Sequence, residues 1–329
     1  MSGAVLVTGA AGFIGSHLVE RLLAQGRPVV CLDSFDEHYD RRQKEANLQE
    51  ALGGRPVPVL EGDVRDGALL RRVLEEHRVE TVVHLAARPG VRPSLEDPRP
   101  YVEINVAGTV AVLEACRAAG VRRLLFASSS SVYGESGGLP VPERAPLRPL
   151  SPYAASKAAA EQFCSTYASL YGISVVALRF FTVYGPRQRP DMAIRRFTEL
   201  IDAGREIEVY GDGSSRRDFT YISDVVDGVA ACLDLPAGGF QAFNLGGARP
   251  VELLHLIDVI QRHLGKEARV RFRPARAGEP ATTFADITRA ARVLGFRPRV
   301  EVEEGVRRFV EWYRARSLPE GKDAAATVS

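Results

Sequence analysis

The chain has 329 residues, enough for about two domains of common size, and 45% of them are hydrophobic while 26% are charged. Its 43 Lys and Arg residues nearly balance its 41 Asp and Glu residues, which leaves a net charge of +2 at pH 7. This balance excludes broad binding to nucleic acid or to an anionic membrane through net charge, and no apolar run approaches the roughly 18 residues that a membrane helix needs.

The cysteines and histidines form no ligand pattern. Four cysteines stand singly, without CxxC spacing, and the six histidines form no cluster of metal-binding spacing. We therefore expect buried thiols in a reducing compartment and no metal site. The first residues, MSGAVLVTGAAG, lack the charged region of a secretory signal, so we expect a cytoplasmic protein.

Short β-branched runs alternate with segments of helical spacing over the first half of the chain. The apolar runs predict strands at residues 4–8, 28–33, 57–60, 81–85, 124–128 and 174–180. They are nearly continuous rather than alternating, as in strands that are buried on both faces. Helical spacing predicts helices at residues 14–25, 41–52, 68–76, 101–119 and 153–171. This alternation favours an α/β fold with a doubly wound, Rossmann-type parallel sheet.

Beyond about residue 181 the pattern loosens into a smaller α/β lobe, which we expect to bind the substrate. Helices are predicted at residues 193–203, 224–235, 251–264 and 302–314, and short strands at residues 206–210 and 242–245. No Ser/Gly-rich linker precedes this part, so it should pack beside the sheet. We thus predict a nucleotide-binding domain with the catalytic helix at residues 1–180, a substrate lobe mainly at residues 181–317 with segments interleaving with the sheet, and a frayed tail at residues 318–329.

A glycine-rich loop follows the first predicted strand. It reads Gly9-Ala10-Ala11-Gly12-Phe13-Ile14-Gly15 and opens the first predicted helix. The first glycine permits a tight turn, the second lets backbone approach a pyrophosphate, and the third lets helix and strand pack closely. Because the loop lies between a strand and a helix, it predicts a dinucleotide site that includes Phe13 and Ile14.

Three further segments at strand ends are candidate cofactor contacts. Asp33 ends the second predicted strand, where a carboxylate would accept hydrogen bonds from the adenosine ribose and repel a 2′-phosphate, so we expect NAD rather than NADP. Asp63 and Val64 follow the third strand, although Asp63 could instead cap the next helix. The run Leu85-Ala86-Ala87 should lie along the cofactor after the fourth strand, and Arg88 is a candidate substrate contact beside it.

The predicted helix at residues 153–171 begins with a tyrosine and a lysine one turn apart. Tyr153 has a free pKa of about 10, so it needs a nearby positive charge to act as a base, and Lys157 and a nicotinamide ring both supply one. A run of serines ends the fifth strand and delivers hydroxyl groups to the same edge. Ser129 is the best candidate to share the reacting proton and Ser131 the second, while turn serines that only bond backbone remain the alternative.

Five ordered motifs extend this pattern over nearly the whole chain: TGAAGFIGSHL, VVHLAA, SSSSVYG, SPYAASK and RRDFTYISD. Together they resemble the extended short-chain dehydrogenase/reductase family, specifically its nucleotide-sugar epimerases and dehydratases. The resemblance implies a retained NAD that takes up and returns a hydride, and catalysis by Tyr153, Lys157 and Ser129. It also implies a UDP- or dTDP-sugar substrate held by the second lobe.

The serine run distinguishes among the family's reactions. The 4,6-dehydratases have an Asp-Glu pair there, and the related decarboxylases have a Glu at the position of Ser131, whereas this chain has Ser130 and Ser131. Without those acids, 4-epimerisation is the accessible chemistry. The segments HYD at residues 38–40, ARPGVRPSLED at residues 87–97 and RFFTVYGP with RPDM at residues 179–192 resemble the UDP-glucuronate 4-epimerases, which convert UDP-glucuronate to UDP-galacturonate.

A uronate substrate requires a cation for its carboxylate. Arg189 is our candidate for a bidentate fork, and Thr182 is a candidate sugar contact. The resemblance further implies that Arg217 and Arg276 contact the diphosphate and that Asn105 lies beside the cofactor. A solvated loop arginine and a satisfied core asparagine are the alternatives at Arg189 and Asn105.

Other functions stay open at this point. A UDP-glucose/UDP-galactose 4-epimerase is the main alternative, followed by a net NAD-dependent dehydrogenase and by a non-catalytic dinucleotide-binding protein. Family members often dimerise through two helices per subunit, so residues 101–119 and 153–171 are candidates for a four-helix bundle in a homodimer.

Overall fold

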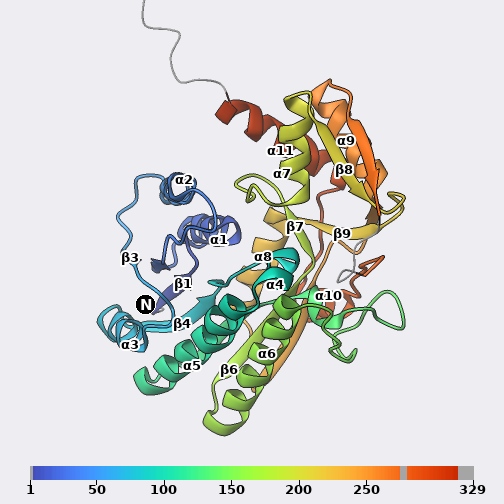
Figure 1. Cartoon of the computed structure of the whole chain (residues 1–329). Helices are drawn as coiled ribbons and strands as arrows, with labels where there is room; N and C mark the ends of the chain where they lie inside the picture. The colour runs from blue at the N-terminus through green and yellow to red at the C-terminus, as the bar shows by residue number, and fades with distance from the viewer. Residues whose placement is uncertain (1–2, 275–279, 318–329) are drawn as a thin grey trace, which may run out of the picture.

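The computed structural model describes residues 3–274 and 280–317, and its centre is a seven-stranded sheet in which every pair of neighbours is parallel. In spatial order the strands are β10 (Phe240–Leu245), β6 (Ser174–Phe180), β5 (Arg123–Ser129), β4 (Val79–His84), β1 (Ala4–Thr8), β2 (Val29–Asp33) and β3 (Val59–Glu61). The predicted doubly wound α/β fold is confirmed (Figure 1).

Helices cover both faces of the sheet. On one face lie α1 (Phe13–Ala24), α2 (Arg41–Leu52) and α8 (Ile222–Cys232), and on the other lie α3 (Gly67–Glu76), α5 (Gly108–Ala119) and α6 (Pro152–Tyr171). Side-chain caps start several of them: Asp40 accepts from the Arg42 N–H at the start of α2, and Ser151 accepts from the Ala154 N–H at the start of α6. The sheet edge where the strands end is thereby fixed between two rigid layers.

The structure differs from the sequence expectation at one element of this layer. The predicted helix 101–119 begins as a π-helical segment, Tyr101–Ala107, before α5. Such segments are rare and often lie at functional sites. Strand β10 comes from the part of the chain assigned mainly to the substrate lobe, whose segments were expected to interleave with the sheet, and it pairs with β6 at the edge of the central sheet.

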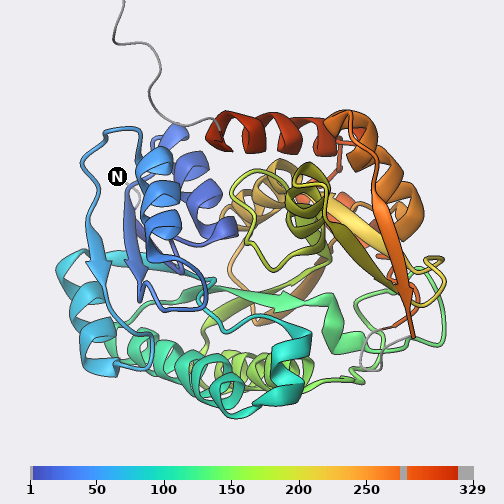
Figure 2. The same cartoon turned by 45° about the horizontal axis from the view of Figure 1, so that its top comes forward.

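The smaller lobe contains two short sheets and the remaining helices. Strands β8 (Glu206–Tyr210) and β12 (Arg269–Arg273) pair with each other, and β7 (Thr182–Tyr184), β9 (Arg216–Tyr221) and β11 (Pro250–Glu252) form a second sheet. The helices are α7 (Ala193–Asp202), α9 (Leu253–Leu264), α10 (Thr288–Leu294) and α11 (Val302–Ser317). Figure 2 shows α11 extending from this lobe toward α2, where Arg316 forms an ion pair with Glu50.

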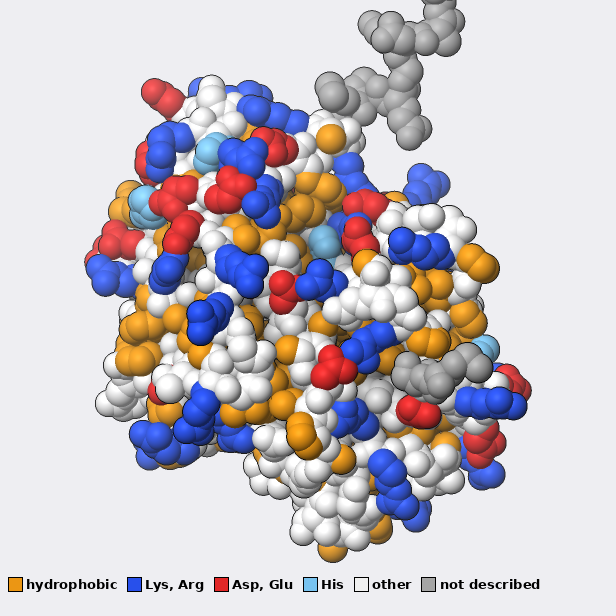
Figure 3. Space-filling view, turned by 180° about the vertical axis from the view of Figure 1, so that it is seen from behind, with side chains coloured by type: hydrophobic (Ala, Val, Ile, Leu, Met, Phe, Trp, Pro, Cys, Tyr) orange, Lys and Arg blue, Asp and Glu red, His pale blue; other side chains and the backbone are white. Residues whose placement is uncertain are grey.

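Two short helices follow strands of the central sheet, α4 (Val91–Glu96) after β4 and the 3₁₀ turn Ser130–Tyr133 after β5. Sequence patterns missed both, because neither is long enough to show a helical period. Within the described ranges, 3–274 and 280–317, no helix has the length and apolarity to cross a membrane. Figure 3 shows basic and acidic side chains interleaved over the face seen from behind.

Candidate active site

The glycine loop lies between the end of β1 and the start of α1. Gly9 has φ +71°, and a Cβ atom there would lie 2.8 Å from the Ala86 nitrogen. A Cβ on Gly15 would lie only 2.0 Å from the Gly9 carbonyl oxygen, so the first turn of α1 packs directly on the loop. Gly12 stands just before Phe13 and Ile14, which begin α1 with its outward-facing N–H groups. The loop thus has the tight turn and the helix N-terminus that a pyrophosphate requires.

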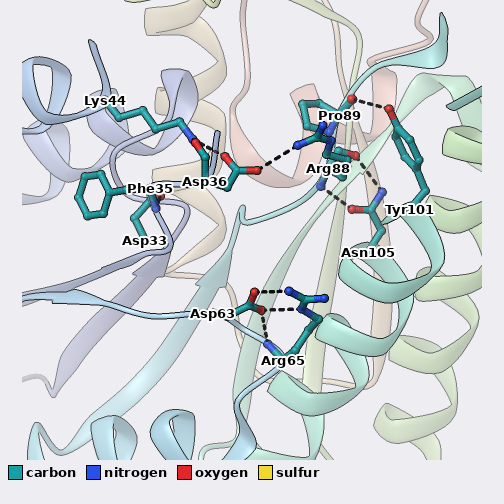
Figure 4. Close-up of polar contacts among 10 residues, drawn as sticks. All are labelled: Asp33, Phe35, Asp36, Lys44, Asp63, Arg65, Arg88, Pro89, Tyr101 and Asn105. Atoms are coloured by element: carbon teal, nitrogen blue, oxygen red, sulfur yellow. Dashed lines mark hydrogen bonds and ion pairs between the residues drawn. The ribbon is translucent and has the colours of Figure 1, made fainter. Parts of the chain in front are cut away.

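Asp33 ends β2 beside this loop and is buried (Figure 4). One carboxylate oxygen accepts from the Ala11 N–H at 2.9 Å and the other from the Phe35 N–H at 2.9 Å. Burial raises the pKa of Asp33, and the two backbone N–H groups and the charge of Lys44 oppose that rise. Each oxygen has a further lone pair, which suits hydroxyl donors of a ribose.

The loop after β4 runs alongside the glycine loop. Leu85 donates its N–H to the Thr8 carbonyl at 3.2 Å, and Ala86 donates to the Thr8 hydroxyl at 3.3 Å. That hydroxyl contacts His84 Nδ1 at 2.8 Å, and His84 Nε2 contacts the Thr109 hydroxyl at 3.2 Å. Burial lowers the pKa of His84 to about 3, so its ring is neutral, and the proton lies on Nε2 because Thr109 already donates to the Asn105 carbonyl. The residues expected along the cofactor, Leu85 to Ala87, are therefore held by β1.

Asn105 holds the next turn of that loop from the π-helical segment (Figure 4). Its Oδ1 accepts from the Arg88 N–H at 2.7 Å, and its Nδ2 donates to the Arg88 carbonyl at 3.0 Å and to the Ser156 hydroxyl at 2.9 Å. Ser156 in turn donates to the Tyr153 carbonyl. The amide therefore joins the cofactor-side loop to the start of α6.

Arg88 points toward the segment after β2 rather than into open space. Its Nη1 lies 3.2 Å from Asp36, which also forms an ion pair with Lys44. No local spacing indicates this pairing, because 52 positions separate Arg88 from Asp36. Arg88 therefore forms an ion pair that links the loop after β4 to the loop after β2, both on the cofactor side of the site.

Asp63 does not cap the following helix. Asp66 does, by accepting from the Ala68 and Leu69 N–H groups, while Asp63 forms an ion pair with Arg65 at 2.7 Å (Figure 4). The capping alternative for Asp63 is therefore wrong. Val64 is buried against Gly108, because a Cβ added to Gly108 would lie 3.0 Å from the Val64 side chain.

Tyr153 and the serine turn meet at the carboxyl edge of β5. Ser131 donates its hydroxyl to Ser129 at 2.8 Å, and Ser129 forms a hydrogen bond with the Tyr153 hydroxyl. Burial raises the pKa of Tyr153, while the Ser129 hydrogen bond and the charge of Arg189 oppose that rise. Lys157 donates to the Ala127 carbonyl at 2.8 Å, and burial lowers its pKa to about 8. The four groups expected to be catalytic lie at the end of β5, in the 3₁₀ turn that follows it, and on α6.

A buried ion pair that was not among the predicted site residues supports the serine turn. Glu161, one turn beyond Lys157, accepts from Arg179 at 2.7 and 3.0 Å and from the Ser128 hydroxyl. Arg179 also donates to the Tyr133 hydroxyl at 2.8 Å. The spacing of four residues from Lys157 to Glu161, together with an arginine inside an otherwise apolar strand, was the available signal. The pair holds both ends of the serine turn against α6.

The substrate-side residues lie on the smaller lobe. Arg189 donates from Nε and Nη2 to the two oxygens of Asp191, both at 3.0 Å, and its charge also bears on the pKa values of Tyr101 and His38. Thr182 begins β7. Arg217, in β9, donates to the Ala281 carbonyl at 3.2 Å.

A cavity of about 320 Å³ lies beside the serine turn. Ser130 and Phe181 line it from the central sheet, and residues 280–284 line it from the smaller lobe. Since Phe181 adjoins Thr182, the cavity borders the expected sugar position. Arg276 lies outside the described residues.

Three comparisons place this geometry among known proteins. The model of the NAD dependent epimerase/dehydratase family matches residues 5–246. A UDP-glucuronate 4-epimerase of Thermodesulfobacterium geofontis is 39% identical over 314 residues, which cover 94% of this chain and 96% of that protein.

Two solved structures are similar over the same length. The UDP-glucuronic acid 4-epimerase from Bacillus cereus, in complex with UDP-glucuronic acid and NAD, matches with a TM-score of 0.90 at 36% identity and covers 95% of this chain and 99% of its own. The UDP-glucose 4-epimerase of Thermotoga maritima with UDP-glucose matches with a TM-score of 0.87 at 32% identity and covers 95% and 99%.

Proposed function

The chain belongs to the NAD dependent epimerase/dehydratase family, and on that premise we propose that it interconverts UDP-glucuronate and UDP-galacturonate by inverting C4 of the sugar. The observation that carries the proposal is the hydrogen-bonded set of Tyr153, Ser129 and Ser131 at the end of β5, in a chain that matches over 95% of its length a 4-epimerase solved with UDP-glucuronic acid and NAD. Serines at positions 130 and 131 support epimerisation over elimination, because no acid stands there to protonate a leaving hydroxyl.

The residues present fit an NAD cofactor. A Cβ on Gly9 or Gly15 would fill the space that the loop needs for its close turn, and Asp33 presents a buried carboxylate at the ribose end. We assign Gly9, Gly12 and Gly15 with Phe13 and Ile14 to the pyrophosphate. We assign Asp63, Val64, Leu85, Ala86, Ala87 and Asn105 to the walls of the cofactor site. When bound, NAD supplies the acceptor and donor of the C4 hydride.

Tyr153 removes the proton of the sugar 4-hydroxyl and later returns it to the same oxygen, after the ring has turned over to present the opposite face of C4. Ser129 stabilises the phenolate by donating to it, and Ser131 orders Ser129 through their 2.8 Å hydrogen bond. Lys157 has a pKa of about 8, so most of it stays protonated at pH 7, and we assign its charge the role of favouring the Tyr153 phenolate. The sugar must turn over between proton removal and return, so Arg217 and Arg276 hold the diphosphate while the ring is held loosely.

Arg189 has room for a second carboxylate. A guanidinium carries five N–H groups, and Asp191 takes one from Nε and one from Nη2, which leaves the edge formed by Nη1 and Nη2. A 4-keto uronate is a β-keto acid that loses carbon dioxide readily when its carboxylate aligns with the carbonyl π system. We assign Arg189, together with Thr182 and Ser130, the role of holding the carboxylate out of that alignment.

A UDP-glucose 4-epimerase is the second candidate. The pairing of Arg189 with Asp191 favours it, because the cation already has a carboxylate partner within its own loop. The similarity to the Thermotoga maritima enzyme also supports it. Arg88 is partnered in the same way, so its contact with the substrate requires the Asp36 pair to open.

The assembly we propose is a homodimer in the cytoplasm. The exposed apolar side chains of Val102 on the π-helical segment and of Phe163 and Leu170 on α6 support a four-helix bundle, because isolated monomers seldom expose such residues together. Four buried free thiols support a reducing compartment.

The deciding experiment incubates the purified protein separately with UDP-glucuronate and UDP-glucose and resolves the products by chromatography. We expect UDP-galacturonate from the first substrate without added NAD, and at least a tenfold lower kcat/KM for the second. Conversion of UDP-glucose alone would replace the uronate assignment with the neutral-hexose one. NADH that accumulates in proportion to product would instead indicate a net dehydrogenase.

A further inference from the structure

The loop of residues 185–192, between β7 and α7, carries Arg189 and is fixed to the nucleotide-binding half of the molecule. We propose that Arg187 is the positioning residue that anchors this loop and thereby sets the place of Arg189 in the site. The inference rests on the proposed role of Arg189 toward a uronate carboxylate.

Arg187 is a buried cation held by two helices of the other half. Its side chain is 3% exposed. Nε and Nη2 donate to one oxygen of Glu50 in α2 at 3.0 and 2.7 Å, and Nη2 lies 2.8 Å from Glu20 in α1. Burial raises the pKa of Glu50, but the bonds and charges of Arg187 and Arg316 lower it overall, so Glu50 is a carboxylate. A buried cation without these partners would be strongly unfavourable, so the loop is constrained to this position.

The backbone on either side of Arg187 is fixed as well. The Pro186 carbonyl contacts His17 Nε2 at 2.9 Å, and the Gln188 carbonyl accepts from Arg195 at 2.7 Å. Burial, together with the charge of Arg187, lowers the pKa of His17 to about 4, so the neutral ring donates its Nε2 proton. Arg187 itself has φ +63°, an uncommon conformation for a residue with a Cβ, which tight contacts must maintain.

These contacts connect the cofactor end to the substrate end. Glu20 lies on α1, the helix that the glycine loop opens, and Glu50 lies on α2. Arg189 follows Arg187 by two residues, so a shift of the anchor moves the guanidinium relative to Tyr153. A 1 Å displacement of a positioning group can cost a large factor in rate, because reaction requires close alignment. Discrimination between uronate and neutral hexose therefore depends on the carboxylates of Glu20 and Glu50.

The test uses variants that keep the fold. Glu50→Gln removes one charge at a partly exposed side chain, and Arg187→Lys keeps the charge but loses the fork. Glu45→Gln is the matched control, because Glu45 lies on the same helix and pairs with Arg41 on the exposed face. We expect Glu50→Gln and Arg187→Lys to lower kcat/KM for UDP-glucuronate by roughly tenfold, the low end for a charge-assisted hydrogen bond. The value for UDP-glucose and the Kd of UDP should change less than about twofold.

A double-mutant cycle and hydrogen exchange complete the test. In an Arg189→Ala background, Glu50→Gln should no longer alter discrimination, and amide exchange at residues 186–192 should rise in Glu50→Gln but not in Glu45→Gln. Equal losses for both substrates, full additivity with Arg189→Ala, or unchanged exchange would overturn the proposal. If the unmodified protein does not use UDP-glucuronate, the proposed function fails, and the exchange measurement on the same proteins still decides whether Arg187 anchors the loop.

Discussion

Replacing Gly15 by alanine tests the cofactor loop most directly. The added Cβ would lie 2.0 Å from the Gly9 carbonyl oxygen and 2.9 Å from the Ala10 Cα, whereas ordinary contacts begin near 3.4 Å. The backbone fixes where a Cβ points, so no rotamer relieves the overlap. The first turn of α1 must therefore move away from the loop by about 1 Å or more.

This movement has two measurable consequences. Overpacking of this kind costs about 1–3 kcal/mol, which corresponds to a fall of a few degrees in Tm for a chain of this length. It also withdraws the N-terminus of α1 from the pyrophosphate, so we expect at least about a tenfold weaker Kd for NAD, since a phosphate at a helix N-terminus depends on the orientation of its N–H groups. Gly67→Ala is the matched control, because Gly67 begins α3 and nothing lies within 4 Å of its added Cβ.

The assay extracts and quantifies NAD from protein purified without added nucleotide and follows thermal unfolding with and without NAD. We expect Gly15→Ala to lose most of its NAD, while Gly67→Ala retains it and unfolds at or slightly above the temperature of the unmodified protein. A Gly15→Ala protein with full NAD content and unchanged Tm would refute the assignment of this loop to the pyrophosphate.

Three further predictions concern the base, the arginines and the pH dependence of stability. Tyr153→Phe should lose about a hundredfold or more in turnover and keep its affinity for UDP, as titration calorimetry can measure; near-normal turnover would remove Tyr153 from the reaction. Arg189→Ala should lower kcat/KM for UDP-glucuronate by about ten- to a hundredfold and leave UDP binding intact, whereas Arg217→Ala should weaken UDP and every UDP-sugar alike. Burial lowers the pKa of His84 to about 3 and of His17 to about 4, so only the unfolded chain takes up these protons below about pH 6.5. Urea unfolding should therefore show each histidine costing about 2 kcal/mol of stability at pH 5 relative to pH 7, and His17→Gln should remove its share.

Local patterns were sufficient for the elements that form the site. The strands at residues 4–8 and 174–180 have the bounds that their apolar runs predicted, because strands buried on both faces leave continuous hydrophobic runs. The glycine loop, Asp33 and the pair Tyr153 and Lys157 were recognisable for a related reason. Each of them places a chemical group at a strand end or on one turn of a helix, and a few consecutive residues are enough to recognise a strand end or a helical turn.

The contacts that orient those groups were not predictable from local sequence patterns. Arg187 and Glu50 are 137 positions apart, and Asn105 and Ser156 are 51 apart, so no local spacing connects them. Strands β7 and β11 were missed because each has only three residues, and β9 was missed because it begins with the charged residues Arg216, Arg217 and Asp218 and has no continuous apolar run. The π-helical start at 101–107 contains Asn105, whose hydrogen bonds to Arg88 and Ser156 depend on the assembled sheet.

The ion pair with Asp191 limits how Arg189 can attract the carboxylate of a uronate substrate. The motif Arg-Pro-Asp contains both the cation and a carboxylate that neutralises it, so net charge alone offers little attraction to a second carboxylate. Selectivity must then come from the direction of the remaining N–H groups, because Asp191 fixes the guanidinium plane by two parallel hydrogen bonds. Arg189→Lys should therefore fail to restore UDP-glucuronate turnover, since an ammonium keeps the charge without the oriented edge. By the same reasoning, Asp191→Asn should increase the free charge of Arg189 and still impair the enzyme, because the guanidinium loses the bidentate contact that aims it at the sugar.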